Sequence, residues 1–325
     1  MNILNLSKKE CTTLKGIAII TVLLSHSSGV CEIFRDIPVL NNKIIFTALC
    51  EAGMPLFLFL SGYGLRMSYN NNGLTRYWFK RLLSVFIPYF VVQSLTMIIY
   101  FVIHGNDHSI VYNLSVLFGI NAANIYDPTM WYISYILFWY FMFWVTHILF
   151  SKPVLQISVL ALGSLAGFIY VPFYWGNNAD YCILPFLSGV VIAYISSMKK
   201  LSDRSITQHF LLAVTVISSV TGFTILIYFH RLNIITENIG SLLSMAALVL
   251  IVKLIHTKTE MKISYSIGNI SFWLYLLEWK LLIKNPVYSK YECNYLTYTL
   301  CLLVTFITAY ICYVLHNLLL RKHLY

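Results

Sequence analysis

Long apolar runs separated by short polar clusters extend along the chain from near its first residue to near its last. A backbone amide inside hydrocarbon has no water to bond, so each run has to pair its own amides as a helix. The runs reach the roughly 20 residues that a helix needs to cross a bilayer, and they lack the alternation of barrel strands. We predict about ten membrane-spanning helices, near residues 14–30, 46–67, 82–103, 130–150, 154–172, 180–198, 209–229, 239–256, 266–284 and 295–319.

The composition favours a membrane protein of a single domain. Hydrophobic residues make up 59% of the chain and charged residues only 10%, whereas soluble domains carry roughly a quarter charged residues. The predicted spans fill residues 1–325 and leave no stretch for a large soluble domain. We therefore expect one all-α membrane domain, in which Lys152 and Pro153 form the tight turn of a helical hairpin.

The positions of the lysine and arginine residues indicate which side of the membrane each loop faces. Cytoplasmic loops are enriched in these residues. With the N-terminus inside, 16 of the 22 fall on the cytoplasmic side: Lys8, Lys9, Lys15, Arg66, Arg76, Lys80, Arg81, Lys152, Lys199, Lys200, Arg204, Lys253, Lys258, Lys262, Arg321 and Lys322. We therefore place both termini in the cytoplasm and attribute the net charge of +10 to topology rather than to nucleic-acid binding.

The seven cysteines do not indicate a metal site. None lies in a CxxC pair, and no histidine follows at ligand spacing. We interpret them as small apolar core residues, while a disulfide between Cys31 and Cys50 across the first outer loop is left open. A metal and a permanently bound cofactor are not expected.

Ionisable groups at membrane depth are costly, so they are the first candidates for function. Lys15 and His26 lie eleven residues apart in the first apolar run, LKGIAIITVLLSH. Eleven residues make three helical turns plus roughly 20°, so both side chains share one face, about 16 Å apart along the axis. A cation for phosphate at one end and a general base at the other suit a donor that reaches into the membrane. The alternative is a snorkelling interfacial lysine and an outer-loop histidine.

The second apolar run contains the small and polar segment GMPLFLFLSGYGL. Small residues in a span usually permit close helix packing, which would explain Ser61, Gly62 and Gly64. Ser61 and Tyr63 are also candidates to line a site in this span.

The basic run RYWFKR follows the second span. Its members Arg76, Lys80 and Arg81 are individually explained by topology. Together with Lys15 they form a dense cationic patch on one side of the membrane, which could hold an anionic donor headgroup.

In their order these segments resemble the acyltransferase-3 family of membrane-bound acyltransferases, which includes polysaccharide O-acetyltransferases. In the first helix of that family a basic residue precedes an essential histidine by ten intervening residues, as Lys15 precedes His26 here. PLFLFLSGYGL looks like the family's second helix and RYWFKRLLSVFIPY like the basic start of its third. Later family segments resemble MWYISYILF, ILPFLSGVVIAY and ISYSIGNISFWLYLLEWKLL.

The chain departs from the family pattern in three respects. A second arginine often follows the first by three residues at the third helix, where this chain has Ser84 after Arg81. The late helix commonly carries a histidine where Glu278 stands, which leaves a site role for that residue open. Some members also have a soluble esterase-like domain, which is not expected within residues 1–325.

The resemblance implies that acetyl-CoA or another short acyl-CoA is the donor, bound through Lys15, Arg76, Lys80 and Arg81. It implies that His26 is catalytic, either deprotonating a sugar hydroxyl or accepting the acyl group transiently. Candidate carboxylates to orient the imidazole are Glu51, Asp127 and Glu278. The expected substrate-binding residues are Ser61, Tyr63, Trp131, Glu51 and Glu278.

The expected acceptor is a hydroxyl of a cell-surface or capsular polysaccharide or of its lipid-linked precursor, in a bacterial plasma membrane. A glycan or lipid transporter or flippase would also have ten helices with few buried charges, but no pair of broken helices occupies matching positions in two halves. A third class is a non-catalytic partner in a polysaccharide assembly complex. Membrane lipids are expected partners, and self-association into a homo-oligomer is left open.

Overall fold

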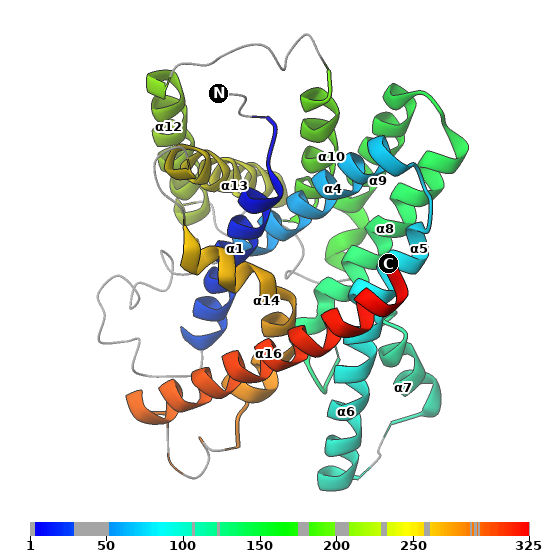
Figure 1. The fold of residues 1–325 in the computed structure, drawn as a ribbon, viewed down its shortest axis with the longest axis vertical. Helices are drawn as coiled ribbons and strands as arrows, with labels where there is room; N and C mark the ends of the chain where they lie inside the picture. Colours follow the sequence, from blue (N-terminus) through cyan, green and yellow to red (C-terminus); the bar gives the residue numbers. More distant parts are fainter. Residues whose placement is uncertain are drawn as a thin grey trace. The chain divides into compact units, whose positions relative to one another are not determined.

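The regular elements of the described residues are all helical in a computed structural model of the chain (Figure 1). The structure describes residues 4–28, 52–105, 108–121, 124–174, 182–198, 208–228, 233–256, 261–286, 288, 291 and 293–324. The all-α prediction is confirmed for this part of the chain.

Each of the ten predicted spans coincides with an observed helix. The helices are α1 (Lys8–Ser28), α4 (Gly53–Asn72), α5 (Tyr77–Arg81), α6 (Ile87–His104), α7 (Ile110–Leu117), α8 (Trp131–Leu149), α9 (Pro153–Tyr174), α10 (Pro185–Ser196), α12 (Gln208–Tyr228), α13 (Ile234–His256), α14 (Lys262–Glu278) and α16 (Tyr295–Leu324). The π-helical segment Leu82–Phe86 joins α5 to α6, and a second one, Trp279–Ile283, extends α14. A 3₁₀ turn, Pro128–Met130, precedes α8. The short helix α7 was not predicted.

Within the described residues, four helices are long and apolar enough to cross a membrane. They cover Tyr77–His104, Pro128–Leu149, Ile234–Ile255 and Tyr295–Leu320. α1 and α4 are of similar length but less apolar, because they carry polar residues that include Lys15, His26 and Ser61. The number of ten spans and the cytoplasmic location of both termini stay predictions.

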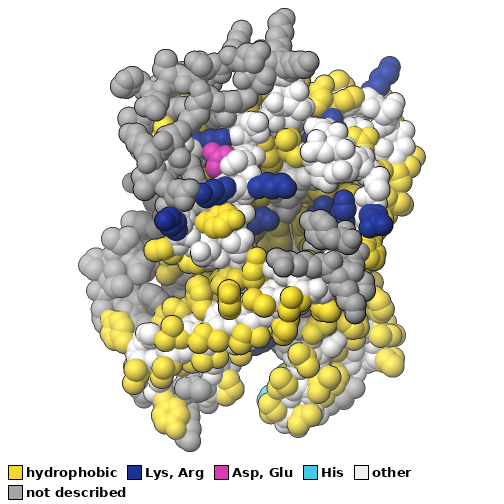
Figure 2. All heavy atoms as spheres, in the orientation of Figure 1, with side chains coloured by type: hydrophobic (Ala, Val, Ile, Leu, Met, Phe, Trp, Pro, Cys, Tyr) yellow, Lys and Arg dark blue, Asp and Glu magenta, His cyan; other side chains and the backbone are white. Residues whose placement is uncertain are grey.

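Exposed apolar side chains form surfaces that suit a lipid bilayer. On α16, the side chains of Leu300, Ile307 and Leu315 are 53, 58 and 57% exposed. Hydrophobic side chains cover much of this helix in Figure 2. Soluble monomers rarely expose large contiguous apolar surfaces, so the exposed side chains of this helix support a multi-pass membrane protein.

The chain forms two compact units, each built from separated stretches of sequence. Unit 1 contains the described parts of residues 1–28, 34–73 and 145–271, and unit 2 those of residues 74–144 and 272–325. Unit 1 therefore holds α1, α4, α9, α10, α12 and α13, while unit 2 holds α5, α6, α7 and α16. α8 and α14 each contribute to both units.

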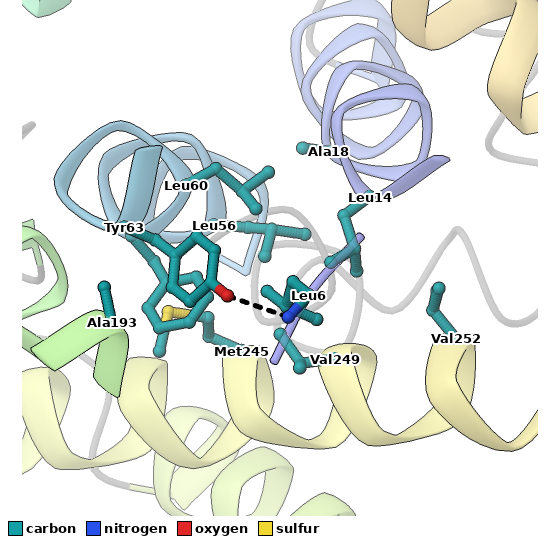
Figure 3. Packing of buried hydrophobic residues seen from close by; sticks show 11 residues of the cluster. Leu6, Leu14, Ala18, Leu56, Leu60, Tyr63, Ala193, Met245, Val249 and Val252 are labelled. Carbon is teal, nitrogen blue, oxygen red and sulfur yellow. Dashed lines mark hydrogen bonds between the residues drawn. The ribbon is translucent and has the colours of Figure 1, made fainter. Parts of the chain in front are cut away.

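Four helices of unit 1 share a hydrophobic core, in which α1, α4, α10 and α13 meet (Figure 3). Its buried members are Leu6, Leu14, Ala18, Leu56, Phe59, Leu60, Tyr63, Ala193, Met245, Val249 and Val252. This core holds the helix that carries Lys15 and His26 against the helix that carries Ser61 and Tyr63.

Glycines allow α4 and α10 to touch backbone to backbone. A Cβ atom added to Gly62 would lie 2.2 Å from the carbonyl oxygen of Phe186, and one added to Gly189 would lie 2.1 Å from that of Phe59. Such distances leave no room for a side chain, so close packing explains Gly62 as expected. The packing interpretation is wrong for Gly64, because a Cβ atom there would meet open space.

Contacts between helix ends in unit 1 test the predicted alternation of helix directions. Asn238 at the start of α13 accepts hydrogen bonds from the backbone N–H groups of Ile183 and Leu184, just before α10 (2.9 and 3.2 Å). Near the other end of α13, Lys253 contacts Glu10 at the start of α1. Each contact joins two helix ends that the predicted alternation places on the same side of the membrane. Which side is cytoplasmic stays a prediction.

Four of the five cysteines within the described residues are free, as the core interpretation requires. Cys182 and Cys301 are buried free thiols. Cys293 is disulfide-bonded, so the interpretation is wrong for this residue. Disulfides persist in oxidising compartments, which agrees with the predicted outer location of the loop before α16. Cys31 and Cys50 lie outside the described residues.

Candidate functional site

Lys15 and His26 lie on one unbroken helix, as their spacing predicts. α1 runs from Lys8 to Ser28, and eleven residues of regular helix place the two positions about 16 Å apart along its axis, on nearly the same face. The Lys15 side chain is exposed and the His26 side chain is half-buried. The helix therefore has a cation near its start and an imidazole near its end. Their joint action on a substrate stays a prediction.

A close crossing with α14 fixes α1 directly beside Lys15. A Cβ atom added to Gly16 would lie 1.8 Å from the carbonyl oxygen of Ser264, and one added to Gly268 would lie 1.8 Å from that of Thr12. The two backbones are thus in direct contact on both sides of the crossing. Because neither helix can rotate without a collision, the direction of Lys15 is set by α14 as well as by α1.

An ion pair that the sequence did not reveal ties the start of α1 to α13. Ser7 and Glu10 form a capping box, in which the Ser7 N–H donates to Glu10 Oε2 (2.7 Å) and the Glu10 N–H donates to Ser7 Oγ (3.2 Å). Lys253 Nζ lies 3.0 Å from Glu10 Oε1 and also donates to the Asn5 carbonyl. Burial acts to raise the pKa of Glu10, but the bonds from Ser7 and Lys253 hold that pKa below its ordinary 4.5. The Ser-x-x-Glu pattern was the available sequence signal.

Cys11 lies on the same turn of α1 and is a poor nucleophile. Burial raises the pKa of its thiol to about 11, although Lys15 and Lys253 lie near enough to oppose the shift. Because the thiolate is the reactive form, a thiol with this pKa is almost fully protonated at neutral pH. Cys11 is therefore not a candidate nucleophile of α1, and the catalytic role of His26 stays a prediction.

Tyr63 and Ser61 occupy neighbouring positions on α4 but differ in their surroundings. The Tyr63 ring is buried, and its hydroxyl accepts a hydrogen bond from the Leu6 N–H at 2.8 Å (Figure 3). Tyr63 therefore anchors the segment before α1, a role that the sequence did not suggest. Ser61 is half-buried. Substrate binding by these two residues stays a prediction.

Arg66, which the sequence indicated only as a topology marker, is a buried cation of unit 1. Its Nη1 donates to Gln156 Oε1 (2.7 Å) and lies 3.3 Å from His147 Nε2. Its guanidinium also faces the rings of Tyr69 and Tyr194, with centroid distances of 5.4 and 5.2 Å. The residues come from α4, α8, α9 and α10, so no local sequence pattern could have brought them together.

The basic run of unit 2 begins in an unusual backbone conformation. Arg76 has a φ of 52° and is exposed at the start of α5. The Lys80 side chain is half-buried, and its carbonyl accepts a hydrogen bond from Ser84 Oγ at 2.7 Å. Ser84, which stands where the family often has a second arginine, thus bonds its own helix instead of offering a charge.

Arg81 is held between two aromatic rings of unit 2. Its guanidinium carbon lies 5.7 Å from the Tyr77 ring centroid and 5.4 Å from that of Tyr140. The Tyr77 hydroxyl donates to the Tyr140 carbonyl at 2.8 Å, which joins α5 to α8. Directly after Arg81 the helix widens into the π-helical segment Leu82–Phe86, a feature that is frequent at functional sites.

Asp127 is engaged in the local structure of unit 2. It accepts hydrogen bonds from the Thr129 N–H (3.0 Å) and Thr129 Oγ1 (2.6 Å), and it forms an ion pair with Lys280. The carboxylate therefore caps the turn before α8 and ties it to the segment after α14. Its predicted role as an orienting group for His26 is untested.

Trp131 and Glu278 are buried in unit 2 at the ends of α8 and α14. Trp131 lies against Tyr135, with ring centroids 6.2 Å apart. Glu278 is fully buried, one turn after Tyr275, whose hydroxyl donates to the Thr129 carbonyl at 2.6 Å. Glu51 lies outside the described residues.

The predicted site residues divide between the two units. Unit 1 contains Lys15, His26, Ser61 and Tyr63. Unit 2 contains Arg76, Lys80, Arg81, Trp131 and Glu278. A shared action of Lys15 and Arg81 on one donor molecule stays a prediction.

Comparison with known proteins gives one match. A family model of acyltransferase domains, Acyl_transf_3, matches residues 10–319, nearly the whole chain. The matched stretch begins at Glu10 in the first turn of α1 and ends within α16, so it contains every predicted site residue. No curated protein and no solved structure matches the chain.

Proposed function

Because the chain belongs to the acyltransferase-3 family, we propose that it is a membrane O-acyltransferase that moves an acetyl or other short acyl group from acyl-CoA to a sugar hydroxyl. The acceptor is a cell-surface or capsular polysaccharide, or its lipid-linked precursor, at a bacterial plasma membrane. The family match over residues 10–319 carries the proposal. The continuous helix that bears both Lys15 and His26 supports it.

The donor binds through its phosphates. Lys15 has an exposed ammonium group at the start of α1, and an ammonium forms strong charge-assisted hydrogen bonds to phosphate oxygens. Arg76, Lys80 and Arg81, which the predicted topology also places at the cytoplasmic face, supply further cations for the phosphates. From there the pantetheine arm extends along α1, so that the thioester lies near His26.

His26 activates the acceptor in the direct route. The neutral imidazole takes the proton of the sugar hydroxyl while the oxygen attacks the thioester carbonyl, which forms the new C–O bond. The C–S bond then breaks, and the leaving CoA sulfur receives the proton from the imidazolium. The products are the sugar ester and free CoA.

In the second route His26 is itself acylated before the sugar arrives. The imidazole nitrogen attacks the thioester carbonyl, and CoA leaves as the thiol, with the N–H proton of the ring. The sugar hydroxyl then takes the acyl group from the ring nitrogen, and the hydroxyl proton returns to the ring. Acid-quenching the enzyme with labelled acetyl-CoA in the absence of acceptor separates the two routes, because only the second leaves label on the protein.

Acyl transfer by the purified protein tests the proposal. We expect proteoliposomes to move label from acetyl-CoA to the surface glycan of the host, and His26→Ala to lower the rate by about 100-fold or more. His104→Ala, which changes an exposed histidine at the end of α6, is the matched control. Full activity of His26→Ala would remove the imidazole from the mechanism. Glycan transport without acyl transfer by the wild type would favour a transporter.

Donor binding is tested separately. Lys15→Ala and Arg81→Ala should raise the KM for acyl-CoA more than the KM for the acceptor, because each removes a phosphate ligand. Lys152→Ala, at an exposed turn, should change neither. Unchanged donor KM in both site variants would exclude the proposed clamp. Mass spectrometry of the host glycan with and without the protein identifies the acceptor hydroxyl.

A further inference from the structure

Arg66 is a buried cation for which the described residues provide no counter-charge. Its side chain lies on α4 and is 5% exposed. Ion pairs of the described residues join Lys253 to Glu10 and Lys280 to Asp127, whereas no described carboxylate reaches Arg66. Charged side chains are almost never fully buried unless they are paired, so this arrangement requires an explanation.

The two hydrogen-bonding neighbours of Arg66 are neutral. A guanidinium can only donate, so the close Nε2 atom of His147 accepts, which places the ring proton on Nδ1 and leaves the ring uncharged. Gln156 turns its oxygen to Arg66 because its Nε2 donates to the Phe150 carbonyl at 2.7 Å. The cluster therefore keeps the full positive charge of the guanidinium.

The remaining contacts stabilise the cation without satisfying all its donors. The rings of Tyr69 and Tyr194 offer their negative faces to the guanidinium. Neither provides an acceptor in the plane of the guanidinium. The buried Nε of Arg66 has no hydrogen-bond partner among the described residues.

We propose that the Arg66 cluster, consisting of Arg66, Tyr69, His147, Gln156 and Tyr194, binds a phosphate group. A phosphate oxygen would accept from Nε and a second from the adjacent guanidinium nitrogen, the two-pronged geometry that arginine gives with phosphate. The cluster lies near the ends of α4, α8 and α10 and the start of α9, which the predicted topology places at the cytoplasmic face. Soluble phosphate compounds and anionic lipid headgroups are both available there. The inference does not depend on the proposed acyl transfer.

The test measures melting temperature in nanodiscs. The first arm uses phosphatidylcholine nanodiscs with inorganic pyrophosphate against chloride at equal ionic strength, and the second adds phosphatidylglycerol to the lipid. The wild type should melt higher in at least one arm. A shift in the first arm alone identifies a soluble phosphate ligand, and a shift in the second arm alone identifies a lipid headgroup.

Two variants remove the site in different ways. Arg66→Gln removes the cation, while Gln156→Glu places a carboxylate beside it and should raise the melting temperature without added anion. Both should weaken the apparent anion affinity by about tenfold or more. Lys152→Gln removes an exposed charge from the turn just before Gln156 and should retain the shift.

The outcomes decide between a ligand site and a structural arginine. Loss of the shift in Gln156→Glu, with retention in Lys152→Gln, supports the proposal even if Arg66→Gln does not fold. A shift that persists unchanged in Gln156→Glu would overturn it, as would a wild type that responds to neither pyrophosphate nor phosphatidylglycerol.

Discussion

Two buried cations of unit 1, Lys253 and Arg66, are stabilised in opposite ways. Their exposed fractions are nearly equal, at 6% and 5%. Lys253 meets the Glu10 carboxylate at 3.0 Å, so the charges of this pair cancel. Arg66 meets an amide, a neutral imidazole and two tyrosine rings, so its charge is not cancelled by the described residues.

The difference shows that the counter-charge, rather than burial alone, distinguishes a structural cation from a candidate binding site. A complete internal pair needs no ligand, and the pair of Lys253 and Glu10 holds the start of α1, the helix of Lys15 and His26, against α13. An incomplete cluster gains stability when an external anion binds, because binding to the folded state alone shifts the folding equilibrium.

The largest effect is expected when the complete pair is broken. Lys253→Met keeps the side-chain length but leaves the Glu10 carboxylate buried without its cation, which should cost about 3–5 kcal/mol of stability. Thermal or denaturant unfolding in detergent measures the loss, and Lys152→Met, at an exposed position, is the control. A loss no larger than that of the control would mean that the pair is not structurally important.

A smaller loss is expected for Arg66→Met in anion-free buffer. This variant removes the charge-assisted hydrogen bond to Gln156 but also removes the burial of an unneutralised charge, so the net cost should be about 1–3 kcal/mol. The same unfolding measurement should show a smaller loss of stability for Arg66→Met than for Lys253→Met. The difference between the two losses should become smaller when pyrophosphate or phosphatidylglycerol stabilises the wild type, because Arg66→Met does not gain that stabilisation. A loss equal to that of Lys253→Met in all conditions would contradict the contrast between the two cations.

Acid should weaken the pair of Lys253 and Glu10 through protonation of Glu10. The folded pKa of Glu10 lies below its ordinary value of 4.5, so the stabilisation is fully present above 4.5 and is lost as pH falls through the folded pKa. Wild type should therefore lose more stability than Glu10→Gln in this acidic window. Unfolding followed as a function of pH measures the difference. Parallel pH profiles of the two proteins would show that Glu10 does not titrate as inferred.

A variant with almost no effect on stability can test which side of the membrane holds the Arg66 cluster and the pair of Lys253 and Glu10. Lys152→Cys changes an exposed turn beside Gln156 and should cost less than about 0.5 kcal/mol. A membrane-impermeant maleimide should label it only after the membrane is permeabilised. In intact cells treated with a reductant, Cys293 should become labelled from outside. The reverse pattern would invert the proposed topology.

The positions of the helices were largely available from the sequence. Each predicted span coincides with a helix, because the hydropathy of a segment and its polar boundaries are local properties. α7 was missed because its eight residues are too short for a span. It is held by a tertiary contact, in which the Tyr126 hydroxyl donates to Asn113 Oδ1 at 2.7 Å.

The candidate site could be predicted only in part from the sequence. The spacing of Lys15 and His26 is a property of one helix, and it survives as such in α1. Tyr63 was predicted to bind substrate, yet its hydroxyl bonds the backbone of Leu6, 57 residues away. Arg66 was interpreted as a marker of the cytoplasmic side because a pattern of basic residues reports loop location, not the surroundings of a side chain.

The amino-acid sequence by itself determined that this is a helical membrane protein of the acyltransferase-3 family, with a cation and an imidazole on its first helix. These conclusions depend on composition and on spacing within single segments. Only the tertiary structure decided that Lys253 is neutralised by Glu10, 243 residues away, and that Arg66 has no such partner among the described residues. The physical reason is that charge compensation depends on distances of a few ångströms between helices, and these distances arise from packing.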